Sequence, residues 1–414
     1  MSLSRRDFLG RSTLLGFSSS LPAFLGQTAR ATPPAARAGA RETILVVVQL
    51  TGGNDGLNTV IPYADPEYRK LRPTIGIAKP DVKKLSDELG LHPAMAGMAD
   101  LYEKRQLSVI QAVGYPNPSQ SHFRSMDIWQ AGSTEEDLSE GWLGRAMKQK
   151  AMTGFHLAAN GNETAPLALA GAPTRVPSLT SLADFQLRTA AADAADQKRQ
   201  RQLISAATQA TTPTPSPLLN FVRRTAAETY ASSERLRELS LKDNSTVVYP
   251  NTSFANRLKL AAQLIDAEVG ARIVYLSLDG FDTHAGQGGG TGVHANLLQT
   301  LSEGIAAFFR DLSARGQAER VCLMTFSEFG RRARENGSAG TDHGSAAPMF
   351  LIGPKVRAGI VGQHPSLTHL DAGNLAFTID FRRIYAAILT DWLGIDSDPI
   401  VGNAFAKWSE LFVS

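Results

Sequence analysis

The stretch from residue 272 to residue 287 constrains the fold of this chain more than any other. It begins with the mostly apolar run Arg-Ile-Val-Tyr-Leu-Ser-Leu and then changes abruptly to a glycine-containing segment with Asp279, Asp282 and His284. Such a run is typical of a buried parallel strand, whose carboxyl end opens onto the crevice where open α/β sheets bind ligands. Two carboxylates and an imidazole at that place are donors that a hard or borderline cation prefers. For this motif alone, a turn with a helix cap is the alternative.

The same pattern recurs along the chain. Apolar runs at residues 44–50, 107–113 and 320–326 predict further strands, and each is followed by polar residues or glycines. Right-handed crossovers would bring the carboxyl ends of these strands to one edge of a sheet. The candidate metal ligands expected at this edge are Asp55, Asp279, Asp282, His284, Glu328, Asp342 and His343. For Asp55, a turn without a ligand is an equal alternative.

Helical patterns alternate with these strands. They cover residues 92–106, 142–152, 253–269, 294–314 and 378–393. Alternating elements without an internal repeat predict an α/β fold, a three-layer α/β/α sandwich with a mostly parallel central sheet, over residues 43–414. Residues from about 150 to 250, which contain a proline-rich segment, are expected to be a mainly helical insertion.

Two serines precede a helical pattern after the strand at residues 107–113. Ser119 and Ser121, with His122 beside them, lie where free backbone N–H groups and the helix dipole favour an anion. A serine in this position is a candidate nucleophile toward a phosphoryl or sulfuryl group, with His122 as a further catalytic candidate. The alternative is that the serine is only an N-cap.

The amino terminus predicts export. Residues 4–10, Ser-Arg-Arg-Asp-Phe-Leu-Gly, form a twin-arginine motif, and a short apolar run and the small-residue site at 29–31 follow it. We expect residues 1–31 to be a signal peptide and residues 32–42 a flexible leader. The apolar run is too short for a stable membrane span. The expected location is therefore the periplasm or the exterior, with the twin-arginine translocase as a partner during export.

Charge and composition exclude one class of partner. The formal net charge is +3 over 414 residues, and the basic residues form no stripe with interleaved aromatics. Nucleic-acid binding therefore has no support.

Five motifs occur in order along the chain: Leu50-Thr-Gly-Gly-Asn-Asp-Gly-Leu-Asn58, Ser121-His-Phe, Gly280-Phe-Asp-Thr-His-Ala, Ser327-Glu-Phe-Gly-Arg331 and Gly340-Thr-Asp-His-Gly344. With the twin-arginine leader, they resemble the exported bacterial family called domain of unknown function 1501, over about residues 40–400. That family is similar to the alkaline phosphatase and sulfatase superfamily. The resemblance implies an α/β/α sandwich with a nucleophile at a helix start and usually two metals.

The resemblance also implies residue roles. Asp55 would be the early metal-bridging carboxylate, Ser121 or Ser119 the nucleophile, and Asp282 and His284 ligands of one metal. Two positions depart from the superfamily pattern. Glu328 stands where an aspartate is usual and is followed by Phe329 in place of a histidine, so Asp342-His343 corresponds either to that displaced pair or to a later single histidine ligand. Pro116 occupies the place of the modified cysteine of sulfatases, which argues against a formylglycine enzyme.

The function expected from these observations is exported, metal-dependent hydrolysis of phosphate or sulfate esters with a serine nucleophile. The cofactor would be one or two divalent cations, with Zn, Mn, Mg and Ca as alternatives, and the substrate a small anionic ester or glycan. Asn54 and Arg331 are expected to bind this substrate. The alternative is a catalytically degenerate envelope protein that binds an anionic glycan or a partner protein.

Overall fold

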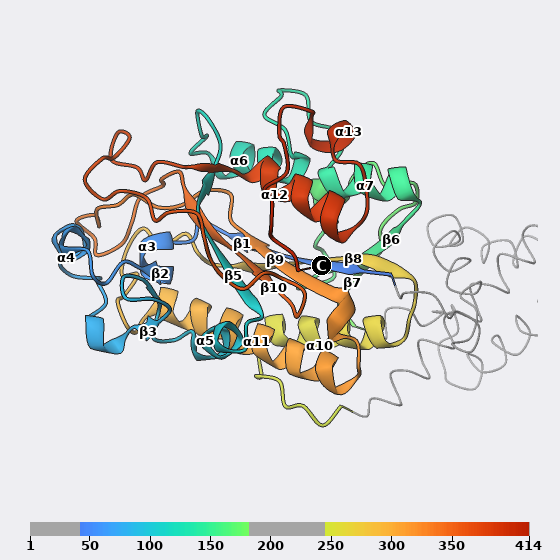
Figure 1. Ribbon diagram of the computed structural model, residues 1–414, viewed down its shortest axis with the longest axis horizontal. Coiled ribbons are helices and arrows are strands. Elements are labelled where there is room, and N and C mark those ends of the chain that lie inside the picture. Colours follow the sequence, from blue (N-terminus) through green and yellow to red (C-terminus); the bar gives the residue numbers. More distant parts are fainter. Residues whose placement is uncertain (1–41, 182–244, 414) are drawn as a thin grey trace, which may run out of the picture.

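A central sheet lies between two layers of helices in the computed structural model, which describes residues 42–181 and 245–413. Figure 1 shows α6, α7, α12 and α13 on one side of the sheet and α5, α10 and α11 on the other. The predicted three-layer α/β/α sandwich is confirmed. The predicted signal peptide and nearly all of the predicted leader lie outside the described residues.

The main sheet has nine strands within the described residues, in the order β11-β5-β10-β9-β1-β8-β6-β7, with β12 also paired to β5. The strands are β1 (Ile44–Thr51), β5 (Leu107–Gly114), β6 (Thr153–Leu157), β7 (Ser178–Leu179), β8 (Ala271–Asp279), β9 (Val321–Phe326), β10 (Ala347–Ile352), β11 (Gly359–Val361) and β12 (Ile379–Asp380). All pairings are parallel except those of β10, which runs antiparallel to both β5 and β9. The amino end of β10 therefore lies at the edge where its neighbours have their carboxyl ends.

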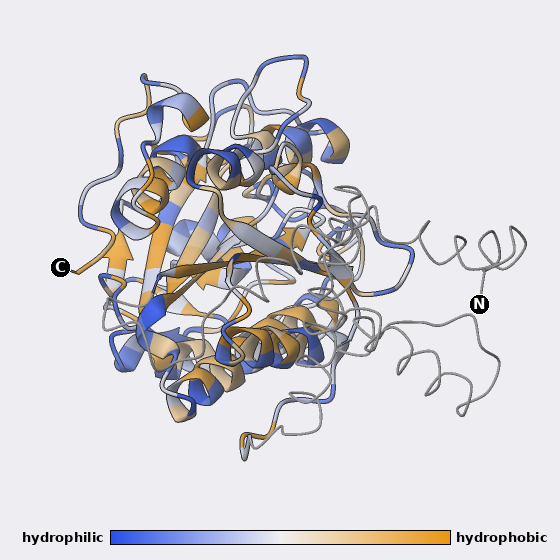
Figure 2. Ribbon diagram, turned by 90° about the vertical axis from the view of Figure 1, so that its right-hand side faces the viewer, coloured by the Kyte–Doolittle hydropathy of each residue, from blue (hydrophilic) through white to orange (hydrophobic). Residues whose placement is uncertain are grey.

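Each face of the sheet packs on its own helical layer. One layer holds α5 (Ala96–Glu103), α10 (Ser253–Asp266) and α11 (Val293–Ala314), and the other holds α6 (His122–Ala131), α7 (Trp142–Lys150), α12 (Phe381–Ala387) and α13 (Asp398–Val401). Successive strand residues point to opposite faces. In β1, accordingly, Val46 and Val48 belong to the first core and Leu45 and Val47 to the second. Figure 2 shows the strands as a largely hydrophobic layer between amphipathic helices.

Short elements complete the fold. The loop after β1 contains α3 (Gly56–Thr59) and α4 (Pro66–Leu71), and β2 (Val60–Ile61), β4 (Gly90–Leu91) and β3 (Lys83–Lys84) form a small second sheet. Within residues 42–181 and 245–413, 3₁₀ helices cover Lys79–Asp81, Leu167–Leu169 and Ala318–Arg320, and a π-helix at Ile388–Trp392 continues α12. Among the residues that the structure describes, no helix combines the length and hydrophobicity that a membrane span requires.

The segment expected to be a helical insertion differs from that expectation in its first part. Residues 153–157 and 178–179 form β6 and β7, which extend the main sheet beside β8. The apolar runs in this part are short and interrupted by glycine and proline, a pattern that strands at a sheet edge share with loops. Residues 182–244 of the expected insertion lie outside the described residues.

Candidate functional site

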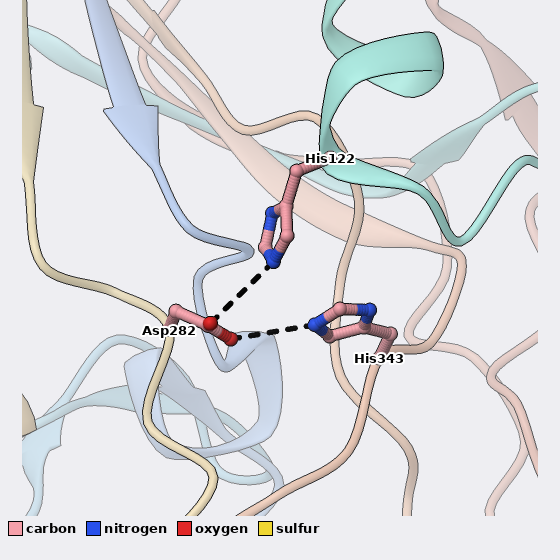
Figure 3. Close-up of side chains that lie close together, drawn as sticks. All are labelled: His122, Asp282 and His343. Carbon is pink, nitrogen blue, oxygen red and sulfur yellow. Dashed lines mark hydrogen bonds and ion pairs between the residues drawn. The ribbon is translucent and has the colours of Figure 1, made fainter.

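Three side chains from distant parts of the chain meet at the carboxyl edge of the sheet. Asp282 follows β8, His122 begins α6 after β5, and His343 precedes β10. The Asp282 carboxylate faces the edges of both rings, with Oδ2 3.5 Å from His122 Nε2 and Oδ1 3.3 Å from His343 Nε2 (Figure 3). The potential ligand atoms of the three residues all lie within 4.8 Å of one another. We call these three residues and His284 the cluster.

His284 completes the cluster from the loop that carries Asp282. Its Nε2 lies 3.1 Å from Asp282 Oδ1 and 2.9 Å from His343 Nε2. Three imidazole Nε2 atoms therefore surround one carboxylate. All four side chains are partly exposed, so that the cluster is open to solvent.

The other nitrogen of each ring faces an oxygen acceptor. His122 Nδ1 lies 2.8 Å from Glu328 Oε1, His284 Nδ1 3.3 Å from Asp342 Oδ1, and His343 Nδ1 2.8 Å from the carbonyl oxygen of Gln120. We assign the Nδ1–H tautomer to each neutral ring on this basis, which leaves the Nε2 lone pairs directed at the cluster. Burial lowers the pKa of His343, which favours the neutral ring there.

Glu328 acts behind His122 and does not reach into the cluster itself. Its carboxylate is fully buried and accepts hydrogen bonds from the Gly52 N–H at 2.8 Å and from the Ser327 hydroxyl at 3.2 Å. A buried carboxylate on the far nitrogen of a histidine fixes the tautomer and the orientation of the ring, an arrangement common around metal ligands. The sequence predicted Glu328 as a metal ligand, whereas the structure places its carboxylate behind His122, where it supports that ring. Asp342 faces the far nitrogen of His284 at 3.3 Å from a partly exposed position, and it also accepts from the Asn336 amide at 3.0 Å.

Two glycines in the loop after β1 allow it to approach the loops after β8 and β9 closely. Gly52 has φ +117°, and a Cβ there would lie 2.4 Å from the backbone nitrogen of Asp282. Gly53 has φ +79°, and a Cβ there would lie 2.5 Å from the ring of Phe329. The Phe329 ring in turn lies against the rings of His122 and His343, at centroid distances of 4.9 and 4.6 Å. Phe329 therefore packs behind the cluster and offers it no ligand atom.

Arg331 is buried behind Asp282. Its guanidinium donates to Asp282 Oδ1 at 2.6 Å and to the carbonyl oxygens of Gly53 at 2.7 Å and Thr341 at 2.8 Å. Burial opposes ionisation of Asp282, but the hydrogen bond and charge of Arg331 outweigh it and lower the pKa of that carboxyl. These contacts bury the guanidinium and occupy its N–H groups. Arg331 therefore holds Asp282 in place, and its guanidinium is not open to the substrate that the sequence predicted it to bind.

Asp55 lies outside the cluster. Its fully buried carboxylate accepts from Arg72 at 2.5 and 3.0 Å and from the Gln287 amide at 2.6 Å. Burial raises the pKa of Asp55, but the Arg72 charge and hydrogen bonds lower it more, to about 2. The prediction of Asp55 as a metal-bridging carboxylate is therefore not supported by its position. Asn54 is also buried, with Oδ1 accepting from Thr59 and His294, so that it holds the loop and is not open to a substrate.

Arg72 and Gln287 are the residues that sequence reasoning missed at this point. A carboxylate buried by a glycine-rich loop requires a cation or hydrogen-bond donors, but no spacing rule indicates that the donors come from residues 72 and 287. Asp279, another predicted ligand, ends β8 and is exposed beside a cavity next to the cluster.

The two candidate nucleophiles lie in the loop that supports His343. Ser121 is the N-cap residue of α6, its side chain is exposed, and it makes no capping hydrogen bond. Gln120 and His122, on either side of Ser121, both contact members of the cluster. Ser119 is half-buried, and its hydroxyl accepts from the Ser121 N–H at 3.3 Å. Ser121 is therefore the better placed of the two.

Comparison with solved structures finds related architectures at low identity. A protein in the alkaline phosphatase superfamily from Vibrio parahaemolyticus is 9% identical with a TM-score of 0.39, covering 93% of this chain and 78% of that one. The C-terminal periplasmic domain of EcEptC from Escherichia coli is 11% identical with a TM-score of 0.41, covering 89% of each chain. Murine ectonucleotide pyrophosphatase/phosphodiesterase 5 is 8% identical with a TM-score of 0.41, covering 90% of this chain and 100% of that one. These values are too low to carry an argument about the site, which rests on its own geometry.

Sequence comparison is more specific. No curated protein sequence matches the chain significantly. The family model described as "Protein of unknown function (DUF1501)" matches residues 42–411. This match confirms the resemblance seen in the ordered motifs. The chain therefore belongs to the DUF1501 family of proteins of unknown function.

Proposed function

We propose that this protein is an exported, metal-dependent hydrolase of phosphate or sulfate esters. The observation that carries the proposal is the convergence of three Nε2 atoms on the Asp282 carboxylate, while each Nδ1 faces an acceptor. The 2.9 Å contact between His284 Nε2 and His343 Nε2 needs a proton or a cation between the two nitrogens, because two bare lone pairs at this distance repel each other. A divalent cation held by these residues would take up the lone pairs and remove the repulsion.

The donor set favours one cation of borderline character. Three imidazole nitrogens and one carboxylate suit Zn²⁺ or a similar transition metal better than Mg²⁺ or Ca²⁺, which prefer oxygen. The carboxylates proposed for a second metal are engaged elsewhere, Asp55 by Arg72 and Glu328 by His122 and Gly52. We therefore propose a single cation at the cluster.

The chain's own residues would serve the reaction as follows. A bound cation would supply Lewis-acid polarisation of the ester. Ser121 Oγ, losing its proton to water, would form a bond to phosphorus or sulfur as the bond to the leaving oxygen breaks and that oxygen takes up a proton from water. A second water would then break the bond between Oγ and phosphorus or sulfur, which releases phosphate or sulfate and restores the serine hydroxyl. The negative charge would lie near the first backbone N–H groups of α6, which have no intrahelical partners and carry the positive end of the helix dipole.

Metal content and turnover test this proposal. Protein purified after export is expected to hold about one equivalent of transition metal and to hydrolyse aryl phosphate or aryl sulfate esters. His343→Ala should lower both metal content and turnover at least tenfold, and Ser121→Ala should abolish turnover with the metal retained. His369→Ala, a change of an exposed histidine outside the cluster, is the matched control. Wild-type protein that takes up no metal and hydrolyses neither class of ester would refute the proposal and favour the degenerate binding protein.

The proposed location rests on the twin-arginine motif at residues 4–10. The motif addresses folded proteins to the twin-arginine translocase, which fits a site assembled from distant segments. Replacing Arg5 and Arg6 by lysine should retain the protein in the cytoplasm. Cell fractionation measures this, and unchanged export of the variant would contradict the assignment.

A further inference from the structure

A second site-like feature lies beside the cluster. A cavity of about 390 Å³ opens at the carboxyl ends of β1, β8 and β6. The polar side chains on its wall include Gln49, His156, Glu163, Tyr275, Ser277 and Asp279. None of the reactions described above uses this cavity.

The strand register explains why the wall is polar. Gln49 pairs with Ser277 and Thr51 with Asp279 across β1 and β8, so that these side chains share one face of the sheet. Earlier residues on the same face, such as Val47, belong to the hydrophobic core. Each strand therefore changes from apolar to polar on one face as it approaches the edge. Burying a polar group costs free energy unless the group has a hydrogen-bond partner. The polar side chains at the ends of β1 and β8 therefore require an explanation.

Part of the wall is held in place. His156 is 2% exposed, with Nδ1 2.9 Å from the Ser178 hydroxyl and Nε2 3.2 Å from Glu163 Oε1. The other oxygen of Glu163 accepts from the Ala159 N–H at 2.6 Å. Gln49 Oε1 accepts from the Gln130 amide at 2.7 Å and from the Tyr275 hydroxyl. These side chains are pre-organised without any ligand.

Another part of the wall has no partner in the protein. The Ser277 side chain belongs to a residue that is 6% exposed, and its hydroxyl has no hydrogen-bond partner within the described part of the chain. The Asp279 carboxylate lines the cavity and is exposed, and it accepts no hydrogen bond from the side chain or backbone of any residue within the described part of the chain. A hydroxyl and a carboxylate two residues apart on one strand thus face the cavity with their hydrogen-bonding capacity unused.

The charges of the wall select among ligands. Glu163 and Asp279 are acidic, and no lysine or arginine is found among the described residues that line the cavity. Arg257 interacts electrostatically with both carboxylates but is buried and donates to the carbonyl oxygen of Leu157 at 3.3 Å. An anionic group is therefore disfavoured in the cavity. Carboxylates, a hydroxyl and amides together suit vicinal hydroxyl groups, which both donate and accept.

The cavity adjoins the cluster along the same edge. Asp279 is followed after two residues by Asp282, and Thr51 by Gly52, whose N–H holds the carboxylate that orients His122. A molecule with an anionic ester at the cluster can thus extend along the strand ends toward the cavity.

We propose that this cavity binds an uncharged, hydroxyl-rich sugar ring, which makes the substrate of the cluster a sugar phosphate or sugar sulfate ester. The substrate part of this statement rests on the function proposed above, whereas sugar binding by the cavity does not. Ser277 and Asp279 bind the ring through hydroxyl hydrogen bonds, and Glu163 provides the second carboxylate.

Binding to the metal-free full chain tests the cavity separately from catalysis. Glucose, galactose, mannose and N-acetylglucosamine serve as probes in ligand-observed NMR titrations, after chelation of any metal. At least one of them is expected to bind saturably in the millimolar range. Ser277→Ala and Glu163→Gln should each weaken this binding at least fivefold. Ser108→Ala is the matched control, because it alters a buried serine near the amino end of β5, away from the cavity. This variant should bind the sugar as the wild type does.

The outcomes separate the two proposals. Equal thermal unfolding temperatures of the wild type and the variants verify that the variants fold. If Ser277→Ala does not fold, Glu163→Gln still tests the cavity, because this substitution preserves the shape of the wall. The absence of saturable binding by every sugar, or binding that both variants leave unchanged, overturns the sugar subsite even if aryl esters are hydrolysed. Sugar binding without metal uptake or ester turnover leaves the cavity assignment intact and overturns the catalytic one. Turnover of sugar esters no better than that of aryl esters overturns the substrate assignment.

Discussion

Replacing Asp55 by asparagine tests whether this residue is an ion-pair partner or a metal ligand. Its carboxylate is fully buried against the guanidinium of Arg72, which is itself 0% exposed. The substitution keeps the size of the side chain but removes its charge. Arg72 is then left buried without a counter-charge, while the cluster is untouched. We therefore expect a loss of stability with retention of metal.

Two arguments give the magnitude. The pKa of Asp55 is lowered from 3.8 to about 2 in the folded protein, which at about 1.4 kcal/mol per pKa unit corresponds to roughly 2–3 kcal/mol of stabilisation at neutral pH. Breaking a buried ion pair by removing one partner typically costs about 3–5 kcal/mol, because the remaining charge is uncompensated. The asparagine amide keeps some hydrogen bonding, so that we expect a loss of about 3 kcal/mol in the free energy of unfolding.

The pH dependence provides a second readout. Because the folded pKa of Asp55 is below the unfolded value, its stabilisation is complete above about pH 4 and is lost as the pH falls toward about 2. The stability difference between wild type and Asp55→Asn should therefore shrink over that interval.

Urea unfolding at several pH values measures the loss of stability and its pH dependence, and metal analysis of the folded variant measures whether the metal is retained. Asp87→Asn, which alters a 95% exposed carboxylate paired with Lys84, is the control and should change the unfolding free energy by less than about 0.5 kcal/mol. Loss of the metal from Asp55→Asn with an unchanged free energy of unfolding would refute the reasoning and restore the ligand role.

Three further predictions concern the surroundings of the cluster. Glu328→Gln should weaken metal affinity about 10–100-fold without changing the ligands, because the far nitrogen of the His122 imidazole loses its carboxylate partner. Competition with a chelator measures this affinity, and an unchanged affinity would exclude the supporting role of Glu328. Gly52→Ala should destabilise the protein by roughly 2 kcal/mol or more and weaken metal binding, because its Cβ would meet the backbone of Asp282 at a positive φ. Gly337→Ala, with open space around it, is the control in the same urea and metal assays, and equal behaviour of the two variants would contradict the steric argument. His294 has a pKa lowered to about 4 by burial, so that its neutral form contributes stability above about pH 6.5 that is lost as the pH falls toward about 4. His294→Gln should make that decline shallower in urea unfolding, and an equally steep decline would show that another group causes it.

The strand pattern allowed the edge of the sheet to be predicted. Hydrophobic runs and the abrupt polar residues after them are local features, and the pairing of parallel strands brings their carboxyl ends together whatever the details of packing. Asp282 and His284 were therefore predicted as ligands at this edge, and the structure places both in the cluster. His122 was predicted only as a catalytic candidate beside Ser121, and the structure brings its ring to the same carboxylate. His343 reaches the same edge for another reason, because β10 runs antiparallel to its neighbours and begins there.

The role of each carboxylate at this edge was decided by tertiary contacts. Asp55 and Glu328 follow strands in the same way as Asp282, yet the first is buried against Arg72 and the second lies behind His122. Which carboxylate remains open to a cation depends on which donors from distant segments reach it. The cavity beside the cluster arises in the same way, from the registration of β1 and β8.

The sequence by itself thus determined the three-layer fold, the edge that carries the cluster and the types of side chain gathered there, because periodicity and strand ends are properties of short stretches. The tertiary structure decided which of those side chains face one another. Burial and partner choice depend on residues that lie from 17 positions apart, as Asp55 and Arg72 do, to more than 200, as His122 and Glu328 do, and short stretches of sequence do not contain that information.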